Sequence, residues 1–227
     1  IKQMGAKVEW QDERTIRICT KNINLNAIPA DLFEKARISV LLIGPLLSRF
    51  LSFKIPHPGG DKIGLRPITT HLESLKAFGI KIRETDGFYC FERPKTLKGA
   101  RIVLKEFSVT ATENIMMASA LAKGKTIIEI AAAEPHVQDL GNFLKAMGLD
   151  IRGIGTHTLE IEGKEKLKGA SYSVSPDIIE AGTFLIAFAI TGGNGIIKNI
   201  EPSHLTFFLE RMKEIGVNLE IKGKNIL

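Results

Sequence analysis

Cysteine is scarce in this sequence of 227 residues, which contains only Cys19 and Cys90. Two cysteines are too few for a disulfide framework, and their spacing is not that of paired zinc ligands. No apolar run reaches the roughly 18 residues that span a bilayer. The first residues also lack the charged start and apolar body of a signal peptide. We therefore expect a cytoplasmic protein rather than a secreted scaffold or a membrane protein.

Tryptophan and tyrosine are also few, and Trp10, Tyr89 and Tyr172 are scattered along the chain. Basic residues are interleaved with acidic ones, and the formal net charge is +6 (31 − 25). A mildly basic chain suits anionic partners, but this pattern forms no stripe for nucleic acid. The histidines do not have the spacing of metal ligands, so we expect no metal site. We also expect no cofactor, no nucleic acid and no membrane partner. A non-catalytic repeat module that binds nucleic acid is kept as an alternative.

The composition is that of a globular chain, with 44% hydrophobic and 25% charged residues. At about 150 residues per domain, the length allows one large domain or two small ones. The sequence opens on a helix-ending glycine, Gly5, and closes inside a strand-like segment, 224–227. The sequence thus begins at the end of an expected helix and ends within an expected strand, and we expect a piece of a longer protein.

A repeat is visible in the glycines that end helices. Each of four amphipathic helices ends in an apolar residue and a glycine, and an alternating segment typical of a half-buried strand follows. Successive glycines are 74, 69 and 68 residues apart, at Gly5, Gly79, Gly148 and Gly216. Three of the helices begin near a proline, which suits a first helical turn, at Pro67, Pro135 and Pro202. Near-equal spacing predicts a true internal repeat.

Each repeat also contains an earlier helix that is apolar nearly all round and must therefore be covered on all sides. These helices are predicted over 36–47, 111–122 and 180–190. Between the two helices of a repeat lies a strand, predicted for example over 125–130 and 195–200. A unit thus reads strand, buried helix, strand, surface helix and two strands over about 68 residues. The predicted fold class is α/β, built from repeated βαβαββ units.

The loop 56–67 is the most unusual segment, with three glycines and three prolines in twelve residues. It leads into a helix, and Arg66 beside a helix start can form an anion site. Arg37 opens the first buried helix, where it needs a partner or an anionic ligand. Hydroxyl side chains at 108–112 lie at the start of the second buried helix. They can cap that helix or donate hydrogen bonds to a phosphate or sugar. Each feature has an alternative, purely structural interpretation. The loop is then an ordinary turn, the side chain of Arg37 extends its charged end to solvent, and the hydroxyls at 108–112 only cap the helix.

Several of these runs resemble the UDP-N-acetylglucosamine 1-carboxyvinyltransferase family of enolpyruvyl transferases. The matching runs cover essentially the whole chain and lie at 36–41, 44–46, 58–60, 63–67, 108–116, 134–140 and 176–184. The resemblance implies an inside-out α/β barrel, as in EPSP synthase, with two domains of three repeats. Residues 1–174 are then most of the catalytic domain, without its beginning. Residues 175–227 are the first unit of the second domain, which is incomplete.

The implied reaction transfers enolpyruvate from phosphoenolpyruvate to the 3-hydroxyl of UDP-N-acetylglucosamine, the first committed step of peptidoglycan synthesis. Both substrates are anionic, so the cleft must supply positive charge. The resemblance makes Asp61 and Arg66 catalytic. It assigns substrate binding to Arg37, Arg66, Pro67, Ile68, Thr69, Thr70, Glu106, Phe107, Ser108 and Val109. We expect the 227 residues alone to be inactive, because other parts of the family's chain complete the cleft.

Three positions depart from the family pattern. Asp61 stands in place of the mobile-loop cysteine that donates a proton and reacts with fosfomycin, Thr69 in place of an aspartate, and Glu106 in place of a lysine. We expect Asp61 to act as general acid when the loop closes over the substrates and expels water. Fosfomycin should then be ineffective, because a carboxylate is a poorer nucleophile than a thiolate. A sister enzyme with a shikimate-like acceptor, as in EPSP synthase, is the alternative reaction.

Overall fold

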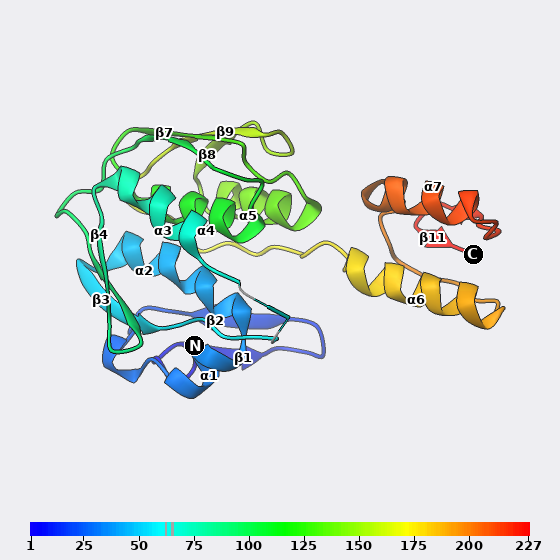
Figure 1. Cartoon of the computed structure of the whole chain (residues 1–227), viewed down its shortest axis with the longest axis horizontal. Coiled ribbons are helices and arrows are strands. Elements are labelled where there is room, and N and C mark those ends of the chain that lie inside the picture. Colours follow the sequence, from blue (N-terminus) through cyan, green and yellow to red (C-terminus); the bar gives the residue numbers. More distant parts are fainter. Residues whose placement is uncertain (62, 65) are drawn as a thin grey trace. The chain divides into compact units, whose positions relative to one another are not determined.

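The computed structural model describes residues 1–61, 63–64 and 66–227 and divides into two compact units, 1–170 and 171–227 (Figure 1). Each unit has a hydrophobic cluster of its own. Among the described residues, no helix has both the length and the apolar character to cross a membrane.

The first unit contains one complete repeat. Its sheet has the order β6 (Arg101–Val103), β7 (Lys125–Glu129), β9 (Thr158–Glu162) and β8 (Asp150–Arg152). Strand β6 runs parallel to β7, and β9 is antiparallel to both β7 and β8. Helix α4 (Val109–Ser119) joins β6 to β7, and α5 (Pro135–Ala146) joins β7 to β8. The predicted order of two helices and four strands is confirmed over 101–162.

The preceding repeat differs from the prediction at its buried helix. One helix was predicted over 36–47, whereas a 3₁₀ helix, η2 (Arg37–Leu42), is followed by α2 (Ile43–Arg49). Pro45 has no N–H to donate to an earlier carbonyl, so it fits only the first turn of a new α-helix. The repeat continues with β3 (Ser52–Pro56), then α3 (Thr69–Leu75) with η3 (Lys76–Phe78), and a hairpin of β4 (Lys81–Thr85) and β5 (Phe88–Glu92).

The start of this repeat also lacks the predicted first strand. A 3₁₀ turn, η1 (Leu25–Ala27), and a short helix, α1 (Ala30–Lys35), precede η2 instead. Before them lies a hairpin of β1 (Lys7–Trp10) and β2 (Ile16–Cys19). All four repeat glycines have left-handed backbones, with φ of +94° at Gly5, +77° at Gly79, +102° at Gly148 and +90° at Gly216. Their predicted role as helix ends is confirmed at Gly79, Gly148 and Gly216, whereas the residues before Gly5 form turns and not the predicted helix.

Helix α4 lies at the centre of the first unit, between α2 and α5 (Figure 1). Eight of its eleven residues are buried, so its apolar circumference is covered as predicted. Within it, the Asn114 side chain accepts a hydrogen bond from the Gly44 N–H (2.7 Å) and donates one to the Val40 carbonyl (3.1 Å). A Cβ at Gly44 would lie 2.5 Å from the Asn114 carbonyl oxygen. Glycine and asparagine together therefore allow the two helices to approach this closely.

The contacts between α2 and α4 also define their relative direction. The Ser48 hydroxyl donates to the Met117 carbonyl (2.7 Å), one turn further along both helices than the contact of Gly44 with Asn114. The helices are therefore parallel, and residues about 70 apart in the sequence lie opposite each other. This separation equals the repeat length, so the starts of the two buried helices lie at the same end of the unit.

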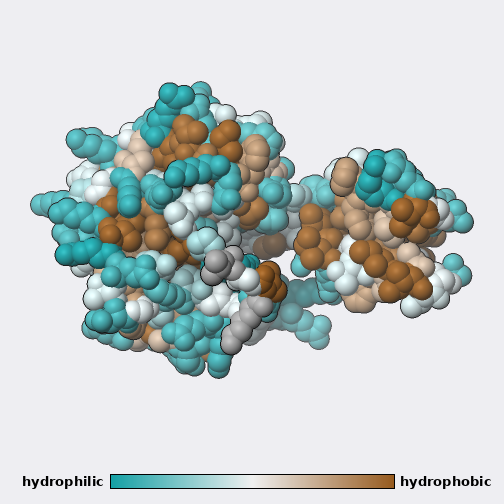
Figure 2. All heavy atoms as spheres, viewed as in Figure 1, coloured by the Kyte–Doolittle hydropathy of each residue, from teal (hydrophilic) through white to brown (hydrophobic). Residues whose placement is uncertain are grey.

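The second unit contains α6 (Ile178–Thr191), η4 (Pro202–Leu205), α7 (Thr206–Glu214) and a hairpin of β10 (Ile221–Lys222) and β11 (Asn225–Ile226). The strand predicted over 195–200 is wrong, because only an isolated bridge joins Ile197 to Ile226. The hairpin of β10 and β11 contains just two residue pairs. It is therefore too short to pair with the segment 195–200 as a third strand. Figure 2 shows apolar surface on this unit, and Ile179, Ile190, Phe207 and Ile215 are each more than 70% exposed.

We predict that Asn114→Leu lowers the free energy of unfolding by about 2–5 kcal/mol, because the Gly44 N–H and the Val40 carbonyl then lose buried partners. Urea titration of the chain measures this change. Asn142→Leu, on the exposed face of α5, is the matched control and should change stability by less than about 0.5 kcal/mol. Equal effects of the two substitutions would contradict the role given to Asn114.

Candidate active site

The glycine-rich loop begins on the backbone of α1. The Gly59 and Gly60 amides donate to the carbonyls of Phe33 (3.4 Å) and Glu34 (3.2 Å). A Cβ at position 59 would lie 1.4 Å from the Glu34 oxygen. Gly60 has a φ of +112°, and a Cβ there would lie 3.0 Å from the Arg37 Cβ. Both glycines are therefore required, and they bring the loop against Arg37 immediately before the exposed Asp61.

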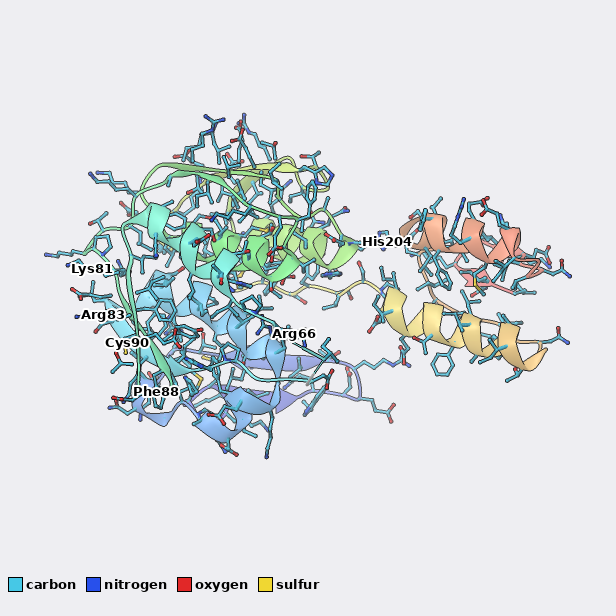
Figure 3. The ribbon with its side chains drawn as sticks, in the orientation of Figure 1. Arg66, Lys81, Arg83, Phe88, Cys90 and His204 are labelled. Atoms are coloured by element: carbon cyan, nitrogen blue, oxygen red, sulfur yellow. The ribbon has the colours of Figure 1, made fainter. Side chains whose placement is uncertain are left out.

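The other end of the loop returns to the same arginine. Arg37 Nη2 donates to the Pro67 carbonyl at 3.1 Å, and Pro67 directly follows Arg66. Lys62 and Leu65, which belong to the run noted above, lie outside the described residues. Arg37 thus links the two ends of the segment that carries Asp61 and Arg66, and Figure 3 labels Arg66 at the end of this loop.

The positive charges of Arg37 and Arg66 are near enough to repel each other. Burial lowers the pKa of the Arg37 guanidinium below its ordinary value, and repulsion from the charge of Arg66 lowers it further. Among the residues that the structure describes, neither guanidinium is within 4.0 Å of a carboxylate oxygen. An anion bound between them would relieve this repulsion. The arrangement therefore suits a phosphate or carboxylate ligand.

The starts of α3 and α4 are joined beside this pair. Ser108 caps α4, its hydroxyl accepting from the Ala111 N–H at 3.4 Å. The Thr70 hydroxyl donates to Glu106 Oε1 at 2.6 Å. Segments 66–70 and 106–109, both expected to bind substrate, are thereby brought into contact. The carboxylate of Glu106, where the family pattern has lysine, is used to hold them together.

The side chains of these two segments differ in exposure. Arg66, Pro67, Thr69, Glu106 and Phe107 are exposed, whereas Thr70, Ser108 and Val109 are half-buried. The Phe107 ring packs against His157 with 4.5 Å between ring centroids. Ile68 is only 3% exposed and belongs to the core. Its side chain is therefore not available to a ligand, and only its backbone can face one.

His71 is a site residue that sequence reasoning did not select. Its side chain is 4% exposed, and its Nε2 lies 2.8 Å from the Thr110 hydroxyl of α4. Burial lowers the pKa of this imidazole to about 4, and the nearby charge of Arg37 acts in the same direction. The missed signal was its spacing, because positions 71, 74, 75 and 78 form the buried face of the helix. A neutral imidazole therefore supports the start of α4.

Glu113 is a second missed residue, one turn further along α4. Its side chain is 7% exposed. Burial raises the pKa of this carboxyl to about 7, and the negative charge of Glu134 adds to the effect. Near neutral pH it therefore changes protonation state. Among the described residues, no group of three or more histidine, cysteine, aspartate and glutamate side chains is arranged to hold a metal ion.

We predict that the His71 imidazole stays neutral until about pH 4 in the folded chain, whereas it titrates near 6.5 when unfolded. The unfolded state then binds the proton more readily, so this residue's effect on stability is lost as pH falls from about 6.5 to about 4. NMR titration of the ring protons, in buffer and in urea, measures both values. A folded-state midpoint near 6.5 would contradict the burial of this group.

Comparison with known proteins places this chain among enolpyruvyl transferases. The family model described as "EPSP synthase (3-phosphoshikimate 1-carboxyvinyltransferase)" matches residues 1–227. Two relatives carry the name UDP-N-acetylglucosamine 1-carboxyvinyltransferase. The protein from Shewanella denitrificans is 45% identical over 216 residues, covering 95% of this chain and 52% of the relative. The protein from Coxiella burnetii is 43% identical over 224 residues, covering 98% of this chain and 51% of the relative.

Solved structures give the same fold. The enolpyruvyl transferase NikO from Streptomyces tendae superposes with a TM-score of 0.80 at 20% identity, covering 99% of this chain and 54% of that one. EPSP synthase from Acinetobacter baumannii gives a TM-score of 0.67 at 22% identity, with 99% and 53% covered. The chain spans about half the length of the curated relatives it matches. Because the family model matches the whole of this chain and the fold agrees, the chain belongs to the EPSP synthase family of carboxyvinyl (enolpyruvyl) transferases.

Proposed function

We propose that this chain is part of an enzyme that transfers enolpyruvate from phosphoenolpyruvate to the 3-hydroxyl of UDP-N-acetylglucosamine. The observation that carries the proposal is the pair formed by Arg37, which contacts both ends of the loop that carries Asp61, and Arg66, which lies in that loop. Among the described residues, neither guanidinium group has a carboxylate partner. Both proposed substrates bear phosphate groups, and a fixed pair of arginines binds such groups well. The names of the relatives from S. denitrificans and C. burnetii support the choice of acceptor.

The proposed chemistry is addition followed by elimination. The sugar hydroxyl loses its proton to a base or to solvent as its oxygen bonds to the central carbon of phosphoenolpyruvate. A proton enters the methylene carbon in the same step, giving a tetrahedral adduct. Loss of that adduct's phosphate and of a proton from the new methyl group restores the double bond. Asp61 donates the first proton. Arg37 and Arg66 offset the negative charge of the substrates, and the segment 106–109 contacts the UDP-sugar at the start of α4.

We further propose the domain assignment 1–174 for the catalytic domain and 175–227 for the first repeat of the second domain. The exposed apolar side chains of α6 and α7 support this assignment, because a helix that is apolar nearly all round needs further elements to cover it. With the proposed substrates, the reaction is the committed step of peptidoglycan synthesis and takes place in the cytoplasm. Activity requires the parts of the cleft that lie outside residues 1–227.

A shikimate-like acceptor is the second candidate, favoured by the description of the family model and by the likeness to EPSP synthase. The two candidates differ in the anionic ligand beside the enolpyruvate donor. One acceptor carries a uridine diphosphate and the other a ring carboxylate with a single phosphate. A direct comparison of the two acceptors separates them.

We predict that a chimera in which residues 1–227 replace the matching stretch of the S. denitrificans relative releases phosphate from phosphoenolpyruvate with UDP-N-acetylglucosamine. With shikimate 3-phosphate we expect no release above background. A phosphate-release assay measures both rates, and circular dichroism reports whether the chimera is folded. A folded chimera that uses only shikimate 3-phosphate would overturn the choice of acceptor.

The same chimera tests Asp61. Asp61→Asn removes the proposed proton donor and should lower turnover by about 10²-fold or more. Asp150→Asn, at an exposed position on β8, is the matched control and should leave turnover within about twofold. Near-normal turnover of the Asp61→Asn chimera would show that the proton comes from another group.

We predict that fosfomycin does not inactivate the chimera, because a carboxylate attacks its epoxide far more slowly than a thiolate does. Intact-mass spectrometry after incubation with the drug should show no adduct. Asp61→Cys should gain one equivalent of the drug, which makes that variant the positive control. A stoichiometric adduct on Asp61 itself would contradict the prediction.

A further inference from the structure

The glycine-rich loop leaves the sheet β3-β5-β4 where β3 ends at Pro56. Strand register places Tyr89 of β5 opposite Ile55 on one side and opposite Glu84 on the other. Side chains that lie opposite each other on paired strands share a face of the sheet, and Ile55 is fully buried on that face. Figure 3 labels Phe88, the partner of Pro56, at the same end of the sheet. Tyr89 and Glu84 therefore lie on the core side of the sheet, next to the start of the loop.

His57 directly follows β3 and contacts both of these side chains. Its ring stacks on the Tyr89 ring, with 4.4 Å between the ring centroids and 28° between the ring planes. Its Nε2 lies 3.2 Å from Glu84 Oε1, and the two groups form an ion pair when the imidazole is protonated. The side chains of His57 and Glu84 are 44% and 59% exposed, so this ion pair contributes little. The stack on Tyr89 is therefore the main contact of His57.

We call residues 57–60 the loop stem. Pro58 restricts His57 to extended backbone conformations. The Gly59 and Gly60 amides donate to the backbone of α1, and Asp61 follows directly. The stem is thus attached to the sheet through His57 and to α1 through its glycines. Glycine and proline have no polar side chain, so His57 is the stem residue whose side chain can form specific contacts.

Tyr89 lies near Arg37 as well as near Glu84. Burial raises the pKa of the Tyr89 hydroxyl, the negative charge of Glu84 raises it further, and the positive charge of Arg37 opposes both. Gly60 approaches the same arginine, because a Cβ there would lie 3.0 Å from the Arg37 Cβ. The ring stack and the candidate anion site thus belong to one cluster of side chains. A shift of the stem would move Asp61 relative to Arg37.

The position of Asp61 is sensitive to the stem because two glycines precede it. Glycine adopts more backbone conformations than other residues do, so contacts on either side must select one of them. A displacement of about 1 Å in a reacting group can lower a rate by about 10²-fold. A contact at His57 can therefore affect proton transfer from Asp61 without touching the substrate.

We propose that His57 is a positioning residue for the proposed reaction. Its stack on Tyr89 holds the loop stem, and the stem presents Asp61 to the substrate bound at Arg37 and Arg66. The contact with Glu84 orients the imidazole and is secondary to the stack. This inference rests on the proposed function, because it assigns to His57 an effect that passes through the proposed proton donor.

Hydrogen exchange in the 227-residue chain tests the hold on the stem without catalysis. NMR follows the Gly60 amide, which donates to the Glu34 carbonyl, and the Gly99 amide, which donates to the Lys123 carbonyl at 2.9 Å and is the internal reference. His57→Ala should speed exchange at Gly60 at least fivefold and leave Gly99 within twofold.

Two further variants separate the stack from other effects of the substitution. His57→Phe retains an aromatic ring on Tyr89, so exchange at Gly60 should stay within twofold of the unsubstituted chain. His136→Ala, at an exposed position on α5, is the matched control and should also stay within twofold. Unchanged exchange at Gly60 in His57→Ala, or equal acceleration in His57→Phe, would overturn the proposal.

The chimera tests the effect on the reaction. His57→Ala should lower kcat about tenfold and leave the KM for phosphoenolpyruvate within about twofold, because Arg37 and Arg66 still bind the anion. His57→Phe should restore kcat to within about threefold. In the Asp61→Asn chimera, His57→Ala should lower kcat by less than twofold further, because no proton donor is left to position. Losses that multiply would show that His57 acts independently of Asp61 and would overturn the proposal.

The two measurements distinguish failure of this inference from failure of the proposed function. An active chimera whose kcat is unchanged by His57→Ala would overturn the positioning role and leave the proposed function in place. A folded chimera that is inactive with both acceptors would overturn the proposed function, and the catalytic part of this inference with it. Faster exchange at Gly60 in His57→Ala would then still establish that the stack holds the stem.

Discussion

The contact between Gly44 and Asn114 is the constraint on which the rest of the first unit depends. Helix α4 is covered on nearly all sides, so its neighbours must approach closely and their backbone groups must find partners. At Gly44 the absence of a side chain permits the approach. The Asn114 amide forms hydrogen bonds with the Gly44 N–H and the Val40 carbonyl, where η2 meets α2. Parallel packing in this register sets the start of η2, at Arg37, at the same end as the start of α4, at Ser108.

The candidate site follows from that register. Arg37 lies where α1, the glycine loop and the start of α3 meet, and its guanidinium holds the Pro67 carbonyl. The loop glycines have no room for side chains against α1, so the loop must leave the sheet along this path. Repulsion between Arg37 and Arg66 is the electrostatic cost of the arrangement. A phosphate-bearing ligand would relieve that repulsion, which links the fold to the proposed chemistry.

Much of the fold could be predicted from the sequence, because glycine ends helices by a local conformational effect. The positive φ values at Gly79, Gly148 and Gly216, each of which follows a helix, confirm it, and Gly5 has the same backbone conformation after a turn. The broken helix over 37–49 shows the limit of helical periodicity, since Pro45 acts through a backbone donor that periodicity ignores. The failed strand over 195–200 shows that a strand pattern requires neighbours to pair with.

The contacts of His71 with Thr110 and of Thr70 with Glu106 depend on tertiary register, so sequence spacing alone could not predict them. The roles of Asp61, Arg66 and the neighbouring segments came from resemblance and stay predictions.

The central claim is that Arg37 and Arg66 form one anion site. NMR titration of the arginine Nε–Hε resonances with phosphoenolpyruvate tests it most directly, because each arginine reports separately. Binding at a single site predicts that these two resonances shift together, with one dissociation constant, while those of Arg83 and Arg93 stay in place. Shifts confined to the other arginines, or different constants for Arg37 and Arg66, would contradict the claim.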